Sequence, residues 1–124
     1  GPETAPLHWP RFCVPIITVD SILANRPNRS AALVKIDVDG PELSVLAGCE
    51  ESLGLAGDVY LVEAALLDTE RGRIGEIISF MTSRGYELFD LIEPLYRPSD
   101  RVLWQLDAIF VPRSSYARAD RSYS

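Results

Sequence analysis

The sequence predicts an α/β fold with one mostly parallel sheet that ends in an antiparallel hairpin. Segments of strand and helix character alternate in the order strand, helix, strand, helix, strand, strand. Such alternation, with right-handed crossovers, produces a parallel sheet covered by helices. The first two strands are almost continuously apolar, which indicates burial on both faces. The last two lie close enough in sequence to pair as a hairpin with a long loop.

The first elements follow from local signals. Residues 1–17 are punctuated by prolines and predict an extended segment, and Gly1-Pro2 resembles the remnant of a cleaved tag. Thr18 to Asp20 offers a helix cap before about one helical turn. Residues 31–38 (A-A-L-V-K-I-D-V) form the first clear strand.

The next elements alternate regularly. Residues 40–42 (G-P-E) suit a helix start, since proline is tolerated there and glutamate complements the helix dipole. Apolar residues then recur at helical spacing up to Leu53, and residues 58–64 (D-V-Y-L-V-E-A) form a second buried strand. A second apolar helical face runs from Ile74 to Met81, with Gly85 as a C-terminal cap.

The C-terminal third contributes two strands and a tail. Residues 86–92 alternate apolar and polar side chains, so one face of this strand is expected to be more exposed. Residues 102–111 form the final strand. From Arg113 onward no apolar period remains, and residues 113–124 are expected to be mobile.

Composition narrows the function classes. The chain has 124 residues, enough for one modest domain, and a net charge of −6. An acidic surface repels phosphate backbones, so we expect no nucleic-acid partner. No apolar run is long enough for a membrane span and no secretory signal is visible, which favours a cytoplasmic protein with no membrane partner. Cys13 and Cys49 follow no metal or redox spacing and are expected to be buried free thiols.

Acidic residues gather where the first two strands end. Asp37 and Asp39 close the first strand and Glu63 closes the second, while Glu42 lies in the first turn of the following helix. The carboxyl ends of neighbouring parallel strands meet at one edge, so these groups should lie close together. Crowded carboxylates can act as a general base or hold Mg²⁺. A structural alternative has Asp39 capping the helix and Glu42 complementing its dipole.

The same region resembles a known family. Residues 34–43 (V-K-I-D-V-D-G-P-E-L) resemble the Lys-Ile-Asp-Val-Glu-Gly-x-Glu-Leu motif of FkbM-type, S-adenosylmethionine-dependent methyltransferases. Further segments are similar to that family's in the same order: residues 14–20 (V-P-I-I-T-V-D), 45–49 (V-L-A-G-C) and 85–91 (G-Y-E-L-F-D-L). Asp39 departs from the family's usual glutamate and reaches about one bond less far.

The resemblance implies a fold and a reaction. It implies that residues 18–112 are the C-terminal half of a Rossmann-like class I methyltransferase domain, contributing strands four to seven in the order four, five, seven, six. It implies methyl transfer from S-adenosylmethionine to a hydroxyl of a small metabolite or sugar. Asp37 is the first choice for accepting the hydroxyl proton, and Asp39, Glu42 and Glu63 are expected to support catalysis or contact the acceptor.

The cofactor-binding half is expected to be missing. No Gly-x-Gly occurs in the sequence, and too few residues precede Val34 for three strands with their crossovers. We therefore expect the chain alone to bind no S-adenosylmethionine and to be inactive. The bare edge of the first strand calls for a partner, and we expect a homodimer or pairing with the missing N-terminal half. Shielding of that edge by residues 3–17 of a monomer is the alternative.

Two other functions stay open at this point. One is a non-catalytic assembly or binding module that has kept the fold and lost the chemistry. The other is a divalent-metal site formed by Asp37, Asp39 and Glu63. No phosphate-binding loop supports the latter, so no metal is assigned.

Overall fold

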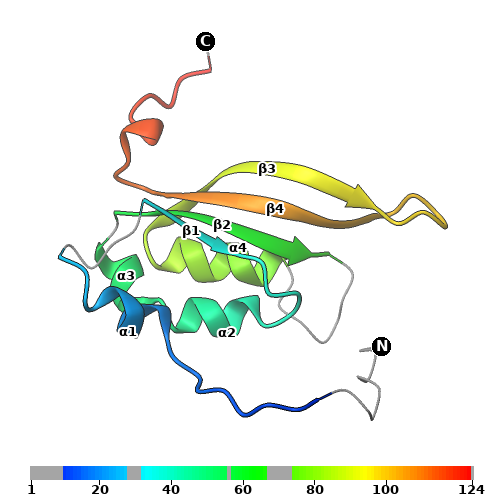
Figure 1. Ribbon diagram of the computed structural model, residues 1–124. Coiled ribbons are helices and arrows are strands. Elements are labelled where there is room, and N and C mark those ends of the chain that lie inside the picture. Colours follow the sequence, from blue (N-terminus) through cyan, green and yellow to red (C-terminus); the bar gives the residue numbers. More distant parts are fainter. Residues whose placement is uncertain (1–9, 28–31, 56, 67–73, 124) are drawn as a thin grey trace.

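The computed structural model describes residues 10–27, 32–55, 57–66 and 74–123 (Figure 1). Gly1-Pro2, expected to be a tag remnant, and the rest of the sequence before Pro10 lie outside the described residues. In chain order the elements are α1 (Val19–Leu23), β1 (Leu33–Ile36), α2 (Glu42–Ala47), α3 (Glu50–Leu55), β2 (Val59–Ala65), α4 (Ile74–Ser83), β3 (Tyr86–Tyr96), β4 (Leu103–Pro112) and the 3-10 helix η1 (Tyr116–Arg118).

The strands form one open sheet in the order β1-β2-β4-β3. The insertion of the last strand between the second and third, expected from the resemblance, is confirmed. The strands β1 and β2 pair in parallel, whereas β4 is antiparallel to both β2 and β3. The prediction of a mostly parallel sheet is therefore wrong: β1, β2 and β3 share a direction, but β4 enters between two of them and makes most pairings antiparallel.

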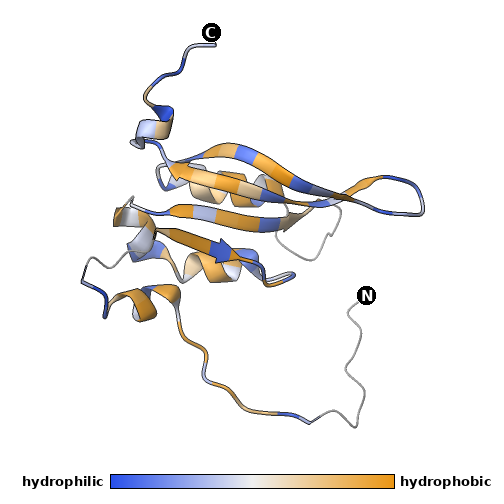
Figure 2. Ribbon diagram, turned by 45° about the horizontal axis from the view of Figure 1, so that its top comes forward, coloured by the Kyte–Doolittle hydropathy of each residue, from blue (hydrophilic) through white to orange (hydrophobic). Residues whose placement is uncertain are grey.

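The α-helices of the described chain all lie on one side of the sheet, where α2 and α4 contact its strands and α1 packs on α3 (Figure 1). Burial alternates along β2, where Tyr60, Val62 and Ala64 are buried among the helices and the intervening residues are partly exposed. The prediction that this strand is buried on both faces is wrong. Among the described residues, no helix covers the second face of the sheet. Figure 2 shows hydrophobic residues along the strands and on the helices. The core contains Ile36, Leu46, Cys49, Leu53, Tyr60, Val62, Ala64, Ile77, Met81, Tyr86, Leu106, Ala108 and Phe110.

The helix expected after the first strand is interrupted at Gly48. The interruption separates α2 from α3, and there the Asp20 amide donates to the Gly48 carbonyl at 2.9 Å. A Cβ on Gly48 would lie 3.2 Å from the Cβ of Thr18, so a side chain at this position would crowd the α1 entry. The apolar periodicity runs through the break, because both short helices face the same core.

The predicted caps at the other helix ends are confirmed. Thr18 is the N-cap of α1, and its side chain accepts a hydrogen bond from the Ser21 amide. After α4, Gly85 adopts a φ of +84°, a conformation that L side chains rarely adopt. This residue turns the chain directly into β3.

The two ends of the described chain differ in their contacts. Residues 10–18 form no helix or strand, and the side chains of Phe12 and Ile16 are 80% and 97% exposed. Cys13 is exposed as well, so its predicted burial is wrong, whereas Cys49 is a buried free thiol as expected. The tail beyond β4 contains η1 and bears arginines that contact β3; its mobility remains a prediction. No helix in the described ranges has both the length and the apolarity to cross a membrane.

Candidate functional site

Three carboxylates meet where β1 and β2 end. The parallel register pairs Ile36 with Val62, so Asp37 comes next to Glu63 at the end of the pairing. The antiparallel register pairs Glu63 with Asp107 of β4. Glu63 lies between the buried residues Val62 and Ala64, so the alternation of the strand turns it to the face that the helices leave open. We call Asp37, Glu63 and Asp107 the carboxylate row.

The carboxylate row changes the acidity of Glu63. Its pKa is raised from 4.5 to about 7, first by burial, then by a hydrogen bond with Asp37 and by the negative charges of Asp37, Asp107 and Asp39. Glu63 is partly buried, so water screens this repulsion incompletely. The arrangement places a carboxylate near its midpoint at neutral pH, where it can both take and release a proton.

Asp37 has a more polar environment. Its side chain is 47% exposed, and its Oδ2 lies 3.7 Å from the Nζ of Lys35. Asp37 is therefore the member of the row that contacts a basic side chain.

Asp39 and Glu42 belong to the turn between β1 and α2. Asp39 and Gly40 have φ values of +50° and +139°, so the chain reverses sharply there. Glu42 is only 4% exposed, and its Oε1 accepts a hydrogen bond of 2.7 Å from the Gly40 amide. Its carboxylate therefore holds the turn and does not join the row.

The structural alternative, in which Asp39 is the cap residue of the following helix, does not hold. Pro41 occupies the N-cap position of α2, and no side-chain hydrogen bond is formed from that position. Asp39 instead adds negative charge near Glu63. Glu42 does lie in the first turn of the helix, as the sequence predicted.

Asp107 was not a predicted site residue. It enters the row only through the register of β4 against β2, which depends on contacts between residues far apart in sequence. The one local signal is an acid within an otherwise mostly apolar strand. Across the described ranges, no three His, Cys, Asp or Glu side chains are placed to hold a metal ion. The divalent-metal alternative thus gains no support from the described carboxylates.

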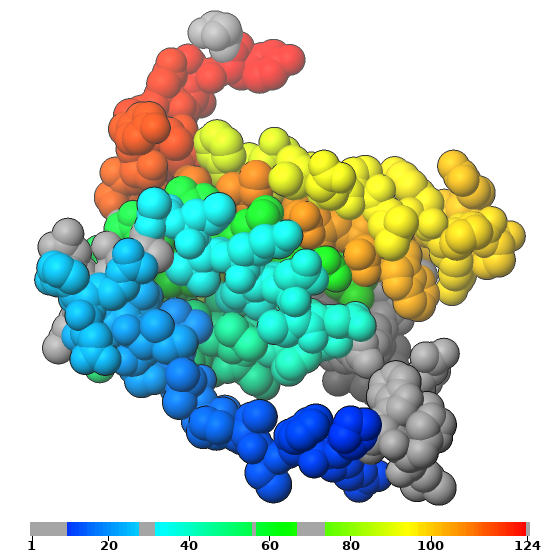
Figure 3. Space-filling view, in the orientation of Figure 1, coloured from blue at the N-terminus to red at the C-terminus, as the bar shows by residue number. Residues whose placement is uncertain are grey.

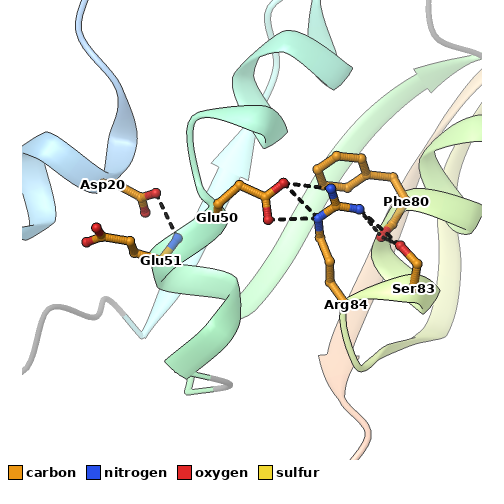
Figure 4. Close-up of polar contacts among 6 residues, drawn as sticks. All are labelled: Asp20, Glu50, Glu51, Phe80, Ser83 and Arg84. Carbon is orange, nitrogen blue, oxygen red and sulfur yellow. Dashed lines mark hydrogen bonds and ion pairs between the residues drawn. The ribbon is translucent and has the colours of Figure 1, made fainter.

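Other polar clusters hold helices together (Figure 4). Asp20 accepts hydrogen bonds from the amides of Glu51 and Ser52 at 2.8 and 2.9 Å, and from the Ser52 hydroxyl at 2.6 Å. Burial tends to raise the pKa of Asp20, but the hydrogen bonds from Ser52 and Glu51 lower it below its usual value. This residue of the T-V-D segment therefore caps α3 from α1, a role that the sequence did not indicate.

A second cluster joins α3 to the end of α4. The Arg84 guanidinium donates to both carboxylate oxygens of Glu50 through Nε, at 3.0 Å each, and its Cζ lies 3.4 Å from the centre of the Phe80 ring (Figure 4). The Arg84 Nη1 also donates to the Phe80 carbonyl at 3.1 Å. These contacts position helices and leave the carboxylate row as the candidate site.

Comparison with known protein families identifies a match that covers this region. The methyltransferase FkbM domain matches residues 12–88, more than half of the chain. No curated protein and no solved structure shows a significant match. The matched range contains β1, the Asp39–Gly40 turn, β2 and all four α-helices, and thus Asp37 and Glu63 of the row. On this evidence the chain belongs to the family of FkbM-type methyltransferases.

Proposed function

We propose that this chain forms the acceptor side of an O-methyltransferase, in which Glu63 takes the proton from a hydroxyl of a small molecule. The observation that carries the proposal is the raised pKa of Glu63, to about 7, within the carboxylate row. A general base is most effective when its pKa lies near the working pH. This makes Glu63, and not Asp37, the proton acceptor in the proposal.

Each of the other acids has a supporting role in this proposal. Asp37 hydrogen-bonds to Glu63 and contributes repulsion that keeps the proton on it. Asp39 adds charge from the turn, and Glu42 fixes that turn through the Gly40 amide. Asp107 strengthens the repulsion from β4. An acceptor hydroxyl within hydrogen-bond distance of Glu63 would give up its proton as its oxygen becomes the nucleophile.

Members of this family use S-adenosylmethionine as methyl donor. The described residues do not fit the donor by themselves, because the sequence has no Gly-x-Gly turn and the turn after β1 is closed by the buried carboxylate of Glu42. That the chain alone binds no S-adenosylmethionine and is inactive stays a prediction, which calorimetric titration with S-adenosylmethionine and S-adenosylhomocysteine tests.

The proposal has a direct test that needs no turnover. The carboxyl carbon of Glu63, followed by NMR across a pH titration, should give a midpoint near 7. Changing Asp37→Asn should move that midpoint downward, because a hydrogen bond and a negative charge are lost or weakened. A midpoint at the ordinary value of 4.5 would remove the general base from the proposal.

In an assembly that catalyses methyl transfer, Glu63 should determine the turnover rate. Glu63→Gln is expected to lower turnover on hydroxyl acceptors by about 10²- to 10⁴-fold, the usual contribution of a general base. Glu76→Gln on the exposed side of α4 is the matched control and should leave turnover unchanged. Equal rates for the two variants would contradict the assignment.

We also propose that the chain pairs with a second copy or with an N-terminal half of the same fold. Two features support this: among the described strands, β1 pairs only on its β2 side, and apolar side chains such as Leu33, Phe12 and Ile16 are more than half exposed. An unpaired strand edge of this kind invites association. Light scattering should give a dimer mass for the pure chain, or a change from monomer to complex when an N-terminal half is added.

The non-catalytic assembly module is the second candidate function. The observation that favours it is the same exposed apolar segment, of which Val14 is 76% exposed and Ile17 64% exposed. If the chain assembles with a partner but Glu63 titrates at its ordinary pKa, the binding module is favoured over the methyltransferase.

A further inference from the structure

Three buried polar groups lie together at the end of the sheet opposite the carboxylate row. Asp58 stands directly before β2 and is 1% exposed, and Tyr60 and Tyr86 are fully buried at the starts of β2 and β3. In the part of the chain that the structure describes, the two carboxylate oxygens of Asp58 and the two phenol hydroxyls have no hydrogen-bond partner. We call Asp58, Tyr60 and Tyr86 the buried oxygen cluster. Buried polar groups nearly always have a partner, so this cluster calls for one.

The register of the sheet brings these three residues together. Tyr60 pairs with Phe110 of β4, so the same antiparallel register, continued by two residues, sets Asp58 opposite Pro112. Pro112 pairs on its other side with Tyr86. The alternating burial of β2 extends back to Asp58, so Asp58 and Tyr60 both turn toward the helices. The rings of Tyr60 and Tyr86 meet edge to face, with their centres 5.4 Å apart.

The buried oxygen cluster contains one acidic side chain and two neutral ones. Burial raises the pKa of Tyr60, and it raises the pKa of Tyr86 to about 12, so both hydroxyls keep their protons at neutral pH. Burial also raises the pKa of the neighbouring Cys49 thiol to about 12. Only the carboxylate of Asp58 is left to bring a negative charge. Among the described residues no lysine or arginine pairs with it, and a buried charge is costly unless an opposite charge balances it.

The polar side chains next to the cluster already have other partners. The Ser52 hydroxyl of α3 lies near Tyr60, but it donates to the carboxylate of Asp20 at 2.6 Å. The Cys49 thiol donates to the Val45 carbonyl at 3.3 Å. These neighbours therefore supply no positive charge to the cluster and leave its oxygens available to a ligand.

We infer that the buried oxygen cluster binds a monovalent metal cation, sodium or potassium, through the carboxylate of Asp58 and the hydroxyl oxygens of Tyr60 and Tyr86. Hard cations take oxygen ligands, and a phenol oxygen can accept as well as donate. One positive charge balances the one carboxylate, whereas a divalent ion would leave a buried positive charge. Gly57, directly before Asp58, is exposed, so the path from solvent is short.

This cation site is separate from the proposed reaction. The carboxylate row lies where β1 and β2 end, whereas the cluster lies where β2 and β3 begin. The inferred role of the ion is to stabilise the fold at that end of the sheet, and it holds whether or not Glu63 acts as a base.

The test compares salts that differ only in their cation. Urea unfolding of the chain is followed in sodium, potassium and choline chloride at the same concentration and pH, because choline is too large for a buried site of three side chains. At a sodium or potassium concentration ten times the dissociation constant, the equilibrium constant for unfolding should be about tenfold lower than in choline chloride.

Ring signals of the tyrosines locate the ion. When sodium or potassium replaces choline, the NMR signals of the Tyr60 and Tyr86 rings should shift and reach saturation. Tyr96 is the internal control, because it is 46% exposed and lies on the β3–β4 hairpin, which projects from the body of the molecule (Figures 1 and 3). Its ring signals should not show a saturable shift.

Three variants assign the ligands. Asp58→Asn removes the charge and should abolish the difference between the salts. Tyr86→Phe removes one ligand oxygen but keeps the ring, so it should reduce that difference, and it decides the matter if Asp58→Asn does not fold. Asp90→Asn makes the same chemical change at an exposed position of β3 and should behave as the native chain does.

Several results would overturn the inference. Equal stability in the three salts would mean that the cluster holds water and no ion. A salt difference that Asp58→Asn and Tyr86→Phe both retain in full would place the ion elsewhere. Ring signals of Tyr60 and Tyr86 that move no more than those of Tyr96 would do the same.

Discussion

Glu63 lies directly opposite Asp107 in the β2–β4 ladder, so two acidic side chains face each other on neighbouring strands. Like charges at directly opposed positions destabilise a sheet. Asp37 brings a third carboxylate to the same place from β1. The sheet tolerates this crowding because Glu63 can keep a proton up to neutral pH.

The first prediction concerns the pH dependence of stability. The folded pKa of Glu63 is about 7, above its ordinary value of 4.5, so the folded chain holds this proton more tightly than the unfolded chain. The free energy of unfolding should therefore fall as the pH rises from about 4.5 through 7. Glu63→Gln removes this loss and should be more stable than the native chain by about 1 kcal/mol at pH 8, with little difference below pH 4.5.

Urea unfolding at pH 4.5 and pH 8 measures this difference. Glu76→Gln, on the exposed side of α4, serves as the control and should not change the pH dependence. A Glu63→Gln variant with the same pH profile as the native chain would show that the row does not hold a proton.

The second prediction concerns the link between α1 and α3. Asp20→Ala removes the carboxylate that caps α3 through the Glu51 and Ser52 amides, and should lower the free energy of unfolding by about 1 kcal/mol. Asp20→Asn keeps an oxygen that can accept the same bonds and should lose much less. Thermal unfolding of the three proteins compares them; equal loss in both variants would point to charge and not to capping.

The third prediction uses two glycines with opposite expectations. Gly85 has a positive φ, so Gly85→Ala should destabilise the chain by about 1 kcal/mol although the site has space. Gly75 lies in α4, and apart from its chain neighbours and the backbone of the helix itself, no described atom is within 4 Å of where its Cβ would be. Gly75→Ala should therefore stabilise the chain by about 0.5 kcal/mol. Chemical denaturation that gives the same sign for both variants would contradict the backbone assignments.

The fourth prediction concerns the C-terminal tail. Glu87 on β3 contacts the guanidinium groups of three tail residues, Arg113, Arg118 and Arg121, at 3.4, 3.4 and 3.0 Å. The hydrogen bond from Arg121, together with the charges of all three arginines, holds the pKa of Glu87 below its usual value. Glu87→Gln should loosen the tail and speed tryptic cleavage after these arginines.

Mass spectrometry of timed digests measures that rate. Asp120→Asn, a change within the tail that leaves Glu87 intact, is the comparison. If the native chain, Glu87→Gln and Asp120→Asn are all cleaved in the tail at the same rate, the arginine contacts do not restrain the tail. The tail would then be mobile, as the sequence predicts.

The sequence predicted much of the fold because its signals are local. The apolar runs around Ile36 and Val62, the cap at Thr18 and the turn at Gly85 each depend on residues within a few positions. It did not predict the break at Gly48, because this break arises from a close approach to Thr18, which lies thirty positions earlier. The periodicity of the core residues gave no sign of it.

The candidate site was predicted in part for the same reason. Asp37 and Glu63 could be placed together because both follow strands that pair in parallel. Asp107 joins the row only through the antiparallel register of β4, which no local pattern specifies. Glu42 was predicted to be a site residue because a carboxylate can act in catalysis. Its burial and the hydrogen bond that it accepts from the Gly40 amide arise only in the folded chain, so the sequence did not reveal them.

The pairing of β3 with β4 slips near Leu88, Ile92 and Leu95, whereas the pairing of β2 with β4 runs without interruption from Tyr60 to Ala65. A one-residue slip in a regular ladder turns every following side chain to the opposite face, but a bulge absorbs an extra residue locally. Insertions and deletions should therefore be tolerated along β3 and rejected along β2. Among related chains, the edge strand β3 could therefore vary in length and shape while the position of Glu63 in the sheet stayed the same.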